Sequence, residues 1–391
     1  MKILVLSSFA FSLVNFRGRL IEAMVREGHQ VVTCAPDSDM AVEAQLAALG
    51  ASYRRIAMAR TGSNPLADLL LLLRYVRLIA RERPDVVLAY TQKPIIYGGI
   101  AARLFRGVRF YALMSGLGYV FSPAADHRRL LRAVVARLYR LAVARARAIF
   151  VFNGDDRDEL IAQGIVDMSA PVMEVPGSGV DLAHFAHASL PKGPPVFLMI
   201  SRLMRDKGVF EYAEAARRLK ARYPQARFQL LGRLDRDNPT GLPEAELDLW
   251  VRQGIIDYVP ETRDVRPLLT GSTVFVLPSY YREGLPRTLL EAMSVGRPLV
   301  TTDLPGCREP VMPGVNGFLV PPRDVDALCE AMEHFLDDPA LAAAMGARSR
   351  AYAEERFDVD KVNRQLLRVM DIGGGESEVT EPSPAMSWSA G

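Results

Sequence analysis

The chain has few of the residues that build disulfide frameworks or metal sites. Its 391 residues include only three cysteines and five histidines. Cys34, Cys307 and Cys329 are odd in number and lack the spacing of metal ligands. The sequence therefore predicts free thiols in a reducing compartment, and it gives no His/Cys cluster for a transition metal.

Long apolar runs are also missing. The longest aliphatic run covers residues 69–73, whereas a membrane-spanning helix needs roughly 20 residues. The apolar run that opens the chain, residues 1–6, is too short for a signal peptide and is typical of a first strand. The net charge of +3 is too small to indicate nucleic-acid binding. We therefore expect a cytoplasmic protein.

Glycine is absent from the turn after the first strand. A dinucleotide-binding domain needs the pattern Gly-x-Gly-x-x-Gly between its first strand and helix. Residues 7–13 contain no glycine. The sequence thus argues against an NAD-dependent oxidoreductase.

Short apolar strands alternate with amphipathic helices in both halves of the chain, which predicts parallel sheets with helices on both faces. The length allows two domains, and the Pro/Gly-rich residues 176–181 and 191–195 indicate the linker between them. Strands are expected at residues 3–7, 30–35, 86–90, 109–114, 148–152, 196–201, 227–232, 274–278 and 299–302, and helices at 17–27, 210–223, 286–295, 325–336 and 357–371.

The most informative motif lies where the expected strand ending near residue 278 meets a helix. It begins at Glu283, passes through a Gly-Leu-Pro turn, and places Glu291 on the helix. Amide groups and the helix dipole favour a phosphate at such a helix start. The two carboxylates can accept hydrogen bonds from sugar hydroxyls. A nucleotide-sugar has both features.

A second motif follows the first strand of the second half. Arg202 and Lys207 lie five residues apart on one loop that ends at Gly208. Their functional interpretation is a two-cation clamp on a diphosphate, and the alternative is a pair of solvated surface charges. Arg205, between them, is expected to face solvent.

Together these motifs resemble the donor site of the retaining GT-B glycosyltransferases of family 4, also called glycosyltransferase group 1, and the resemblance covers nearly the whole chain. It implies an α/β GT-B fold, in which two Rossmann-like domains face each other across a cleft. The expected parts are an acceptor domain at residues 1–180, a donor domain at 195–356, a helix at 357–372 that packs back on the first domain, and a disordered tail at 373–391.

The resemblance also implies roles for single residues. Glu291 would hold the ribose hydroxyls, and Glu283 would contact the donor sugar. Arg202 and Lys207 would neutralise the leaving diphosphate, which makes these two and Glu283 the expected catalytic residues. The remaining expected donor contacts are the amides of Gly284 and Leu285 and the hydroxyl of Thr288.

No metal is expected. Asp235 and Asp237 have the Asp-x-Asp spacing of metal-dependent glycosyltransferases of the other common fold. A diphosphate site made of cations and amides leaves a metal without a role, so we interpret this segment as a polar loop at the cleft mouth. Cys307, which follows a later strand, is expected to be packed rather than nucleophilic, because no base accompanies it.

On the acceptor side the chain departs from the common family pattern. Residues 7–11 lack a glycine pair, and residues 113–118 lack a histidine. Segments around Arg17, Lys93 and Ser115 instead resemble enzymes that add N-acetylhexosamines to polyprenyl-diphosphate-linked sugars. The resemblance makes these three residues candidates for acceptor binding, with the two cations on the acceptor's diphosphate. A surface position explains each lone cation equally well.

Residues 130–148 form a basic, apolar segment with arginines at 132, 137, 140, 145 and 147. Such a helix can lie on an anionic membrane, or it can pack on a sheet with its arginines in water. A lipid-linked acceptor favours the interpretation in which this helix lies on the membrane.

The sequence therefore predicts a retaining glycosyltransferase that uses a UDP-sugar, with GDP left open, in surface polysaccharide or glycan assembly. No carboxylate pair suited to double displacement is recognisable, so the resemblance implies front-face transfer. The alternative is a nucleotide-sugar epimerase of the same fold.

Overall fold

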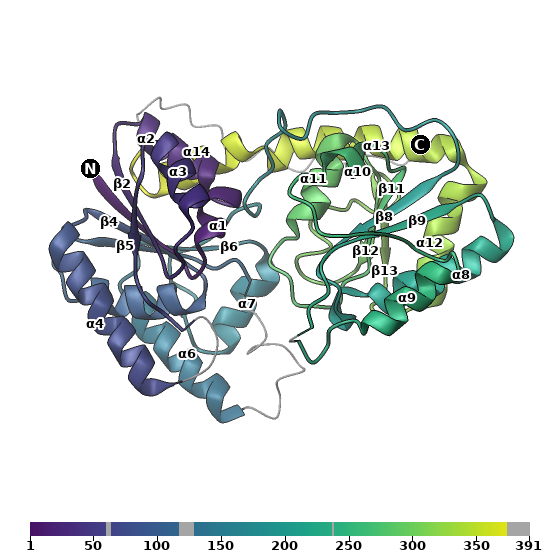
Figure 1. Cartoon of the computed structure of the whole chain (residues 1–391). Coiled ribbons are helices and arrows are strands. Elements are labelled where there is room, and N and C mark those ends of the chain that lie inside the picture. The colour runs from purple at the N-terminus through teal and green to yellow at the C-terminus, as the bar shows by residue number, and fades with distance from the viewer. Residues whose placement is uncertain (60–63, 117–128, 237, 374–391) are drawn as a thin grey trace.

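The computed structural model describes residues 1–59, 64–116, 129–236 and 238–373. The chain forms two lobes that lie side by side (Figure 1), and each lobe is built on one parallel sheet. Residues 374–391, most of the expected disordered tail, lie outside the described part of the chain. Within the described part, no helix is both long and apolar enough to cross a membrane.

The N-terminal lobe contains a seven-stranded parallel sheet with the strand order β3-β2-β1-β4-β5-β6-β7. Helices α1 to α3 and the C-terminal α14 (Val359–Val369) cover one face, and α4, η1, α5, α6 and α7 cover the other. The bounds are β1 Lys2–Leu6, α1 Ala10–Asn15, α2 Gly18–Arg26, β2 Gln30–Ala35, α3 Met40–Ala48, β3 Ser52–Arg55, α4 Pro65–Glu82, β4 Val86–Tyr90, η1 Pro94–Gly98, α5 Gly99–Ala102, β5 Arg109–Leu113, α6 Arg129–Val143, β6 Ala148–Val151, α7 Gly154–Ala162 and β7 Val172–Glu174.

The C-terminal lobe repeats this plan with six parallel strands in the order β10-β9-β8-β11-β12-β13. Its core is a single cluster of aliphatic and aromatic side chains around the sheet. The bounds are β8 Val196–Ile200, η4 Arg205–Lys207, α8 Val209–Arg222, β9 Arg227–Leu231, α9 Glu244–Arg252, β10 Asp257–Val259, α10 Arg266–Thr270, β11 Val274–Leu277, α11 Arg287–Val295, β12 Leu299–Thr302, β13 Gly317–Val320, α12 Val325–Asp337, α13 Pro339–Tyr352 and η5 Ala353–Phe357.

The chain crosses between the lobes twice, and the two crossings touch. The amide of Val180 donates to the carbonyl of Phe357 at 2.8 Å, and the amide of Val359 donates back to Val180 at 3.0 Å. Beyond this point α14 packs against α2 and joins the N-terminal core. The backbone therefore connects the lobes at two adjacent points, and any movement of one lobe relative to the other must change the backbone there.

Two expected helix boundaries were wrong. The segment expected as one helix at 130–148 is helical only to Val143, and Ala148 already begins β6. The helix expected at 357–371 begins at Val359, because a short π-helix, Ala353–Phe357, precedes it and Asp358 caps the new helix through the amide of Asp360.

Candidate active site

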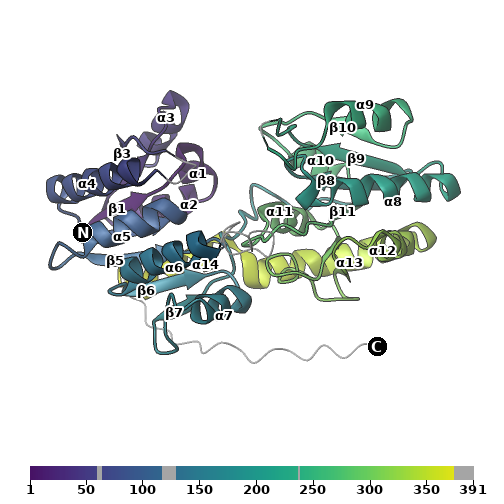
Figure 2. The same ribbon diagram turned by 90° about the horizontal axis from the view of Figure 1, so that it is seen from below.

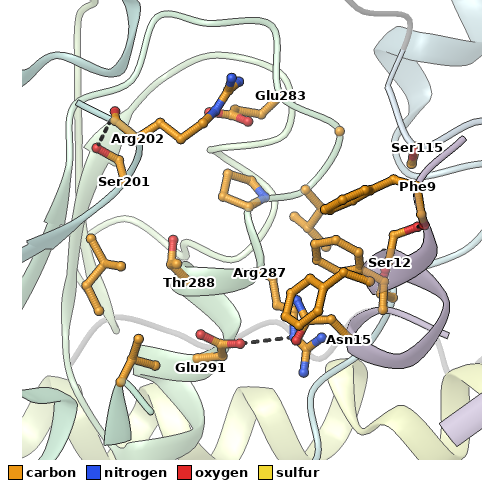
Figure 3. Close-up of a pocket in the computed structure, with 18 of the residues that line it drawn as sticks. Phe9, Ser12, Asn15, Ser115, Ser201, Arg202, Glu283, Arg287, Thr288 and Glu291 are labelled. Carbon is orange, nitrogen blue, oxygen red and sulfur yellow. Dashed lines mark hydrogen bonds and ion pairs between the residues drawn. The ribbon is translucent and has the colours of Figure 1, made fainter. Parts of the chain in front are cut away.

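The strand order reverses direction at one point in each sheet, between β1 and β4 and between β8 and β11. Ligands of open parallel sheets bind outside the carboxyl ends of the strands at such a reversal. The two reversal points face each other across a cleft of about 960 Å³. In Figure 3, Phe9, Ser12 and Asn15 of the N-terminal lobe lie opposite Arg202, Thr288 and Glu291.

All seven residues expected to bind the donor line this cleft. They are Arg202, Lys207, Glu283, Gly284, Leu285, Thr288 and Glu291. The first two follow β8 and the others follow β11, so neighbouring strands bring together two motifs about 80 residues apart in the sequence.

The turn that carries Lys207 is fixed by backbone contacts. Gly208 adopts φ 78°, and a Cβ atom there would lie 2.2 Å from the carbonyl oxygen of Pro278. The amides of Tyr280 and Tyr281 both donate to the carbonyl of Asp206, at 2.9 and 2.8 Å. Only glycine fits such a close approach, and the β8 and β11 loops are therefore held together.

This arrangement pairs Lys207 with Glu283. The Lys207 ammonium donates to Oε1 of Glu283, and Ser279 Oγ donates to the same oxygen at 2.9 Å. Both charged side chains are mostly buried, yet both face the cleft. A partly buried ammonium at a cleft wall is suited to stabilising negative charge on a bound phosphate, because water screens it little.

Arg202 lies at the more open edge of the cleft. Its guanidinium forms an ion pair with Asp235 at 3.3 Å and is about half exposed. Asn238 also donates to Asp235, at 3.2 Å. The first acid of the Asp-x-Asp segment therefore holds Arg202, while Asp237 lies outside the described residues. No cluster of three or more metal-ligating side chains occurs in the described ranges.

Glu291 lies deeper, on α11. Its carboxylate is 3.0 Å from Nε of Arg287 (Figure 3). Burial raises the pKa of Glu291 to about 7, although the neighbouring guanidinium opposes that change. The carboxyl group therefore changes its charge near neutral pH. Thr288, one turn earlier on the same helix, also lines the cleft.

On the opposite wall Arg17 is almost completely buried. Its guanidinium lies 5.4 Å from the ring centre of Tyr90 and 5.9 Å from that of Phe152. Burial lowers its pKa to about 10. Among the described residues Nε of Arg17 has no hydrogen-bond partner, and no acidic side chain forms an ion pair with it. Arg17 and Ser115 both line the cleft.

Lys93 does not line the cleft. Its ammonium forms an ion pair with Asp68 of α4 at 2.8 Å, and both side chains are mostly buried. The structure therefore brings Arg17 and Ser115 to the candidate site and places Lys93 against the helix beside it.

The lobes also touch directly at the glycine turn of the donor motif. Asn153, which caps α7, donates to the carbonyl of Gly284 at 3.2 Å. A Cβ atom on Gly284 would lie 2.3 Å from the carbonyl oxygen of Ser115. Nearby, Arg282 lies 3.5 Å from Glu159 of α7. The donor turn is thus part of the contact between the lobes.

Sequence reasoning missed two parts of the cleft. Phe9, Phe11 and Phe16 form an aromatic wall next to Arg17, and residues 261–265 line the side beyond β10. Both segments follow the carboxyl ends of strands, which is the signal that points to them. Cys307 is buried with a free thiol whose pKa is raised to about 12 by burial.

Two facing Rossmann-like lobes, with a cation and carboxylate site at the reversal point of the second, make up the GT-B architecture of nucleotide-sugar enzymes. Residues 182–352 match the family described as glycosyl transferases group 1, and residues 14–175 match the glycosyl transferase 4-like domain. The two matches together span most of the chain, which is therefore a glycosyltransferase with a glycosyl transferase 4-like first domain and a group 1 second domain.

Named relatives are similar over long stretches. The chain is 26% identical over 385 residues to the N,N'-diacetylbacillosaminyl-diphospho-undecaprenol alpha-1,3-N-acetylgalactosaminyltransferase of Campylobacter jejuni, covering 95% of this chain and 98% of the relative. It is 28% identical over 288 residues to the UDP-Gal:alpha-D-GlcNAc-diphosphoundecaprenol alpha-1,3-galactosyltransferase of Escherichia coli, covering 70% and 72%.

Solved structures share the fold. HepE from Anabaena, crystallised in complex with UDP, superposes with a TM-score of 0.77 at 20% identity and covers 95% of this chain and 100% of its own. The sucrose-phosphate synthase of Thermosynechococcus elongatus has a TM-score of 0.76 at 18% identity, covering 95% and 98%.

Proposed function

We propose that this glycosyltransferase moves an N-acetylhexosamine from a UDP-sugar to a polyprenyl-diphosphate-linked saccharide, with retention at the anomeric carbon, in surface polysaccharide or glycan assembly. The observation that carries the proposal is the Lys207–Glu283 pair at the β8/β11 reversal point, facing the cleft. The names of the Campylobacter jejuni and Escherichia coli relatives support a lipid-linked acceptor.

The donor would lie across the C-terminal half of the cleft. Glu291 would accept hydrogen bonds from the ribose hydroxyls, and the diphosphate would meet the amides of Gly284 and Leu285, the Thr288 hydroxyl and the start of α11. Arg202 and Lys207 would complete its charge neutralisation. The crystallised complex of HepE with UDP supports UDP as the nucleotide.

In the proposed reaction, the bond between the anomeric carbon and the diphosphate oxygen breaks while the acceptor oxygen bonds to the same face of the sugar. The acceptor's proton passes to the leaving phosphate oxygen. Lys207 and Arg202 stabilise the negative charge that grows on that oxygen. Glu283, held by Lys207 and Ser279, lies beside the expected sugar. This catalysis consists of positioning and electrostatics.

The acceptor would enter from the N-terminal lobe. Arg17 is a buried cation without an acidic partner in the described part of the chain, so an anionic group is the ligand that best offsets its desolvation. The acceptor's diphosphate is such a group. Ser115, next to the donor turn, would contact the acceptor sugar, and Lys93 would act from beside the cleft.

The proposal requires no metal ion, because the two cations neutralise the diphosphate. It also places the enzyme at the cytoplasmic face of the cell membrane, in peripheral contact with anionic lipid through α6. Nucleotide-sugar epimerisation, the alternative of the same fold, has no observation in its favour.

The test is product formation with a panel of UDP- and GDP-sugars, with and without a polyprenyl-diphosphate-linked saccharide, and with and without EDTA. We expect acceptor-dependent release of UDP and a new glycolipid with a retained anomeric configuration, unchanged by EDTA. Isomerised donor without acceptor would establish an epimerase. Loss of activity in EDTA that added Mg²⁺ or Mn²⁺ restores would refute the metal-free mechanism.

A further inference from the structure

Four leucines on successive turns of α4 are exposed to solvent. Leu66 is 73% exposed, and Leu69, Leu70 and Leu73 are each 50–53% exposed. They occupy the outer side of the first three turns, while Leu71 on the inner side is buried against the sheet. Isolated exposed leucines are common in proteins, but a contiguous row of four marks an interaction surface.

A second exposed apolar row lies on α6. Leu130 is 79% exposed, and Val134 and Leu141 follow at helical spacing with more than 40% exposure. Both helices cover the same face of the N-terminal sheet, with η1 and α5 between them. Figure 2, the view from below, shows α4, α5 and α6 side by side in front of the sheet.

The exposed charge on these two helices is positive. Arg77 and Arg81 are exposed on α4, as are Arg137 and Arg140 on α6. The two acids of α4, Asp68 and Glu82, are already paired with cations. Residues 129–147 contain no acidic residue. Leucines flanked by exposed arginines fit the interface of an acidic bilayer, which has an apolar interior and an anionic surface.

The leucine row also lies at the edge of the sheet that opens on the cleft. In a parallel sheet, a helix that follows a strand begins at the carboxyl edge, and α4 follows β3 while α6 follows β5. The ion pair between Asp68 of α4 and Lys93, just after β4, fixes this position. A membrane against these turns would place a lipid-linked diphosphate next to the acceptor side of the cleft.

We propose that the outer faces of α4 and α6 form a membrane-docking surface, in which Leu66, Leu69, Leu70 and Leu73 enter the interface of an anionic bilayer and the arginines contact its phosphates. The benefit for catalysis rests on the proposed lipid-linked acceptor, whereas docking itself does not. The rival occupant of the leucine row is a second copy of this chain.

The experiment is co-sedimentation of the full chain with vesicles of phosphatidylcholine, with or without 30 mol% (about one lipid in three) phosphatidylglycerol. The variant is Leu66→Glu/Leu70→Glu. The matched control is Met40→Glu/Leu249→Glu, which adds the same charge at exposed apolar positions on α3 and α9. Light scattering gives the oligomeric state, and UDP binding confirms that each variant is folded.

We expect wild type and control to bind the anionic vesicles, and the leucine variant to bind them about tenfold or more weakly, because two charges replace apolar contacts. The variant should keep its turnover on a short-chain, water-soluble acceptor and lose it on a full-length polyprenyl acceptor in vesicles. Unchanged vesicle binding by the leucine variant would overturn the proposal. The proposal would also be overturned if the wild type formed a dimer that did not bind vesicles and if the leucine substitutions dissociated that dimer. If the wild type bound vesicles as expected but transferred sugar to no acceptor, only the proposed function would be refuted, and the docking surface would stand.

Discussion

Replacing Lys207 by methionine tests the proposed chemistry most directly, since it keeps the length of the side chain and removes only the charge. The ammonium contacts Glu283, lies 5.2 Å from the ring centre of Tyr281, and is mostly shielded from water. Removing one donor that stabilises a developing negative charge in such a site costs about 3–4 kcal/mol, or roughly 10²–10³ in kcat. Donor affinity should fall much less, because Arg202, Glu291 and the backbone amides remain.

The same change leaves the Glu283 carboxylate without its counter-ion. Ser279 still donates to it at 2.9 Å, so we expect a loss of about 1–3 kcal/mol in the free energy of unfolding. The double variant Lys207→Met/Glu283→Gln should recover much of this stability, yet it should not recover turnover. Comparison of the two variants separates the structural cost from the catalytic one.

Arg205→Met is the matched control, because Arg205 belongs to the same short helix but is exposed and lies 4.2 Å from the ring centre of Phe210, away from the cleft. Single-turnover transfer and calorimetric UDP binding are the two measurements. The reasoning is refuted if Lys207→Met turns over at a near-normal rate, or if Arg205→Met loses as much activity as Lys207→Met.

Three further changes have definite expected results. UDP affinity should rise between pH 6 and 8 as Glu291, whose folded pKa is about 7, becomes ionised, and calorimetry on Glu291→Gln should show no such rise. Because that pKa lies above the unfolded value of 4.5, urea unfolding should show wild type losing about 2 kcal/mol relative to Glu291→Gln between pH 5 and 8. Gly284→Ala should slow transfer at least about tenfold while UDP binding is largely kept, because its Cβ would lie 2.3 Å from Ser115 O and prevent the lobes from closing; an unchanged rate would contradict this. Asn153→Ala should destabilise the protein by about 1 kcal/mol through the lost α7 cap, and a thermal melt equal to that of wild type would disprove it.

The sequence predicted the elements whose signals are local. The buried strand Val86–Tyr90 is a continuous apolar run and Gln30–Ala35 is mostly apolar, and the structure has both at the expected bounds. The strand Ser52–Arg55 was missed, because it lies at the edge of its sheet and its Ser-Tyr-Arg-Arg sequence carries no apolar signal. The helix α4 was also missed, since its outer leucines obscure the amphipathic period that identifies a surface helix.

The two acceptor cations show what local sequence cannot decide. A lone Arg17 and a lone Lys93 look equivalent in the sequence, but the fold treats them differently. Lys93 obtains a carboxylate from α4, whereas Arg17 is enclosed by Tyr90 and Phe152 from two distant segments and has no acidic partner among the described residues. A buried charge without a counter-ion costs free energy in the empty enzyme. An anion that reaches Arg17 therefore recovers this cost on binding, whereas one that binds Lys93 must first compete with Asp68. By this argument, the binding of the acceptor diphosphate should depend more on Arg17 than on Lys93.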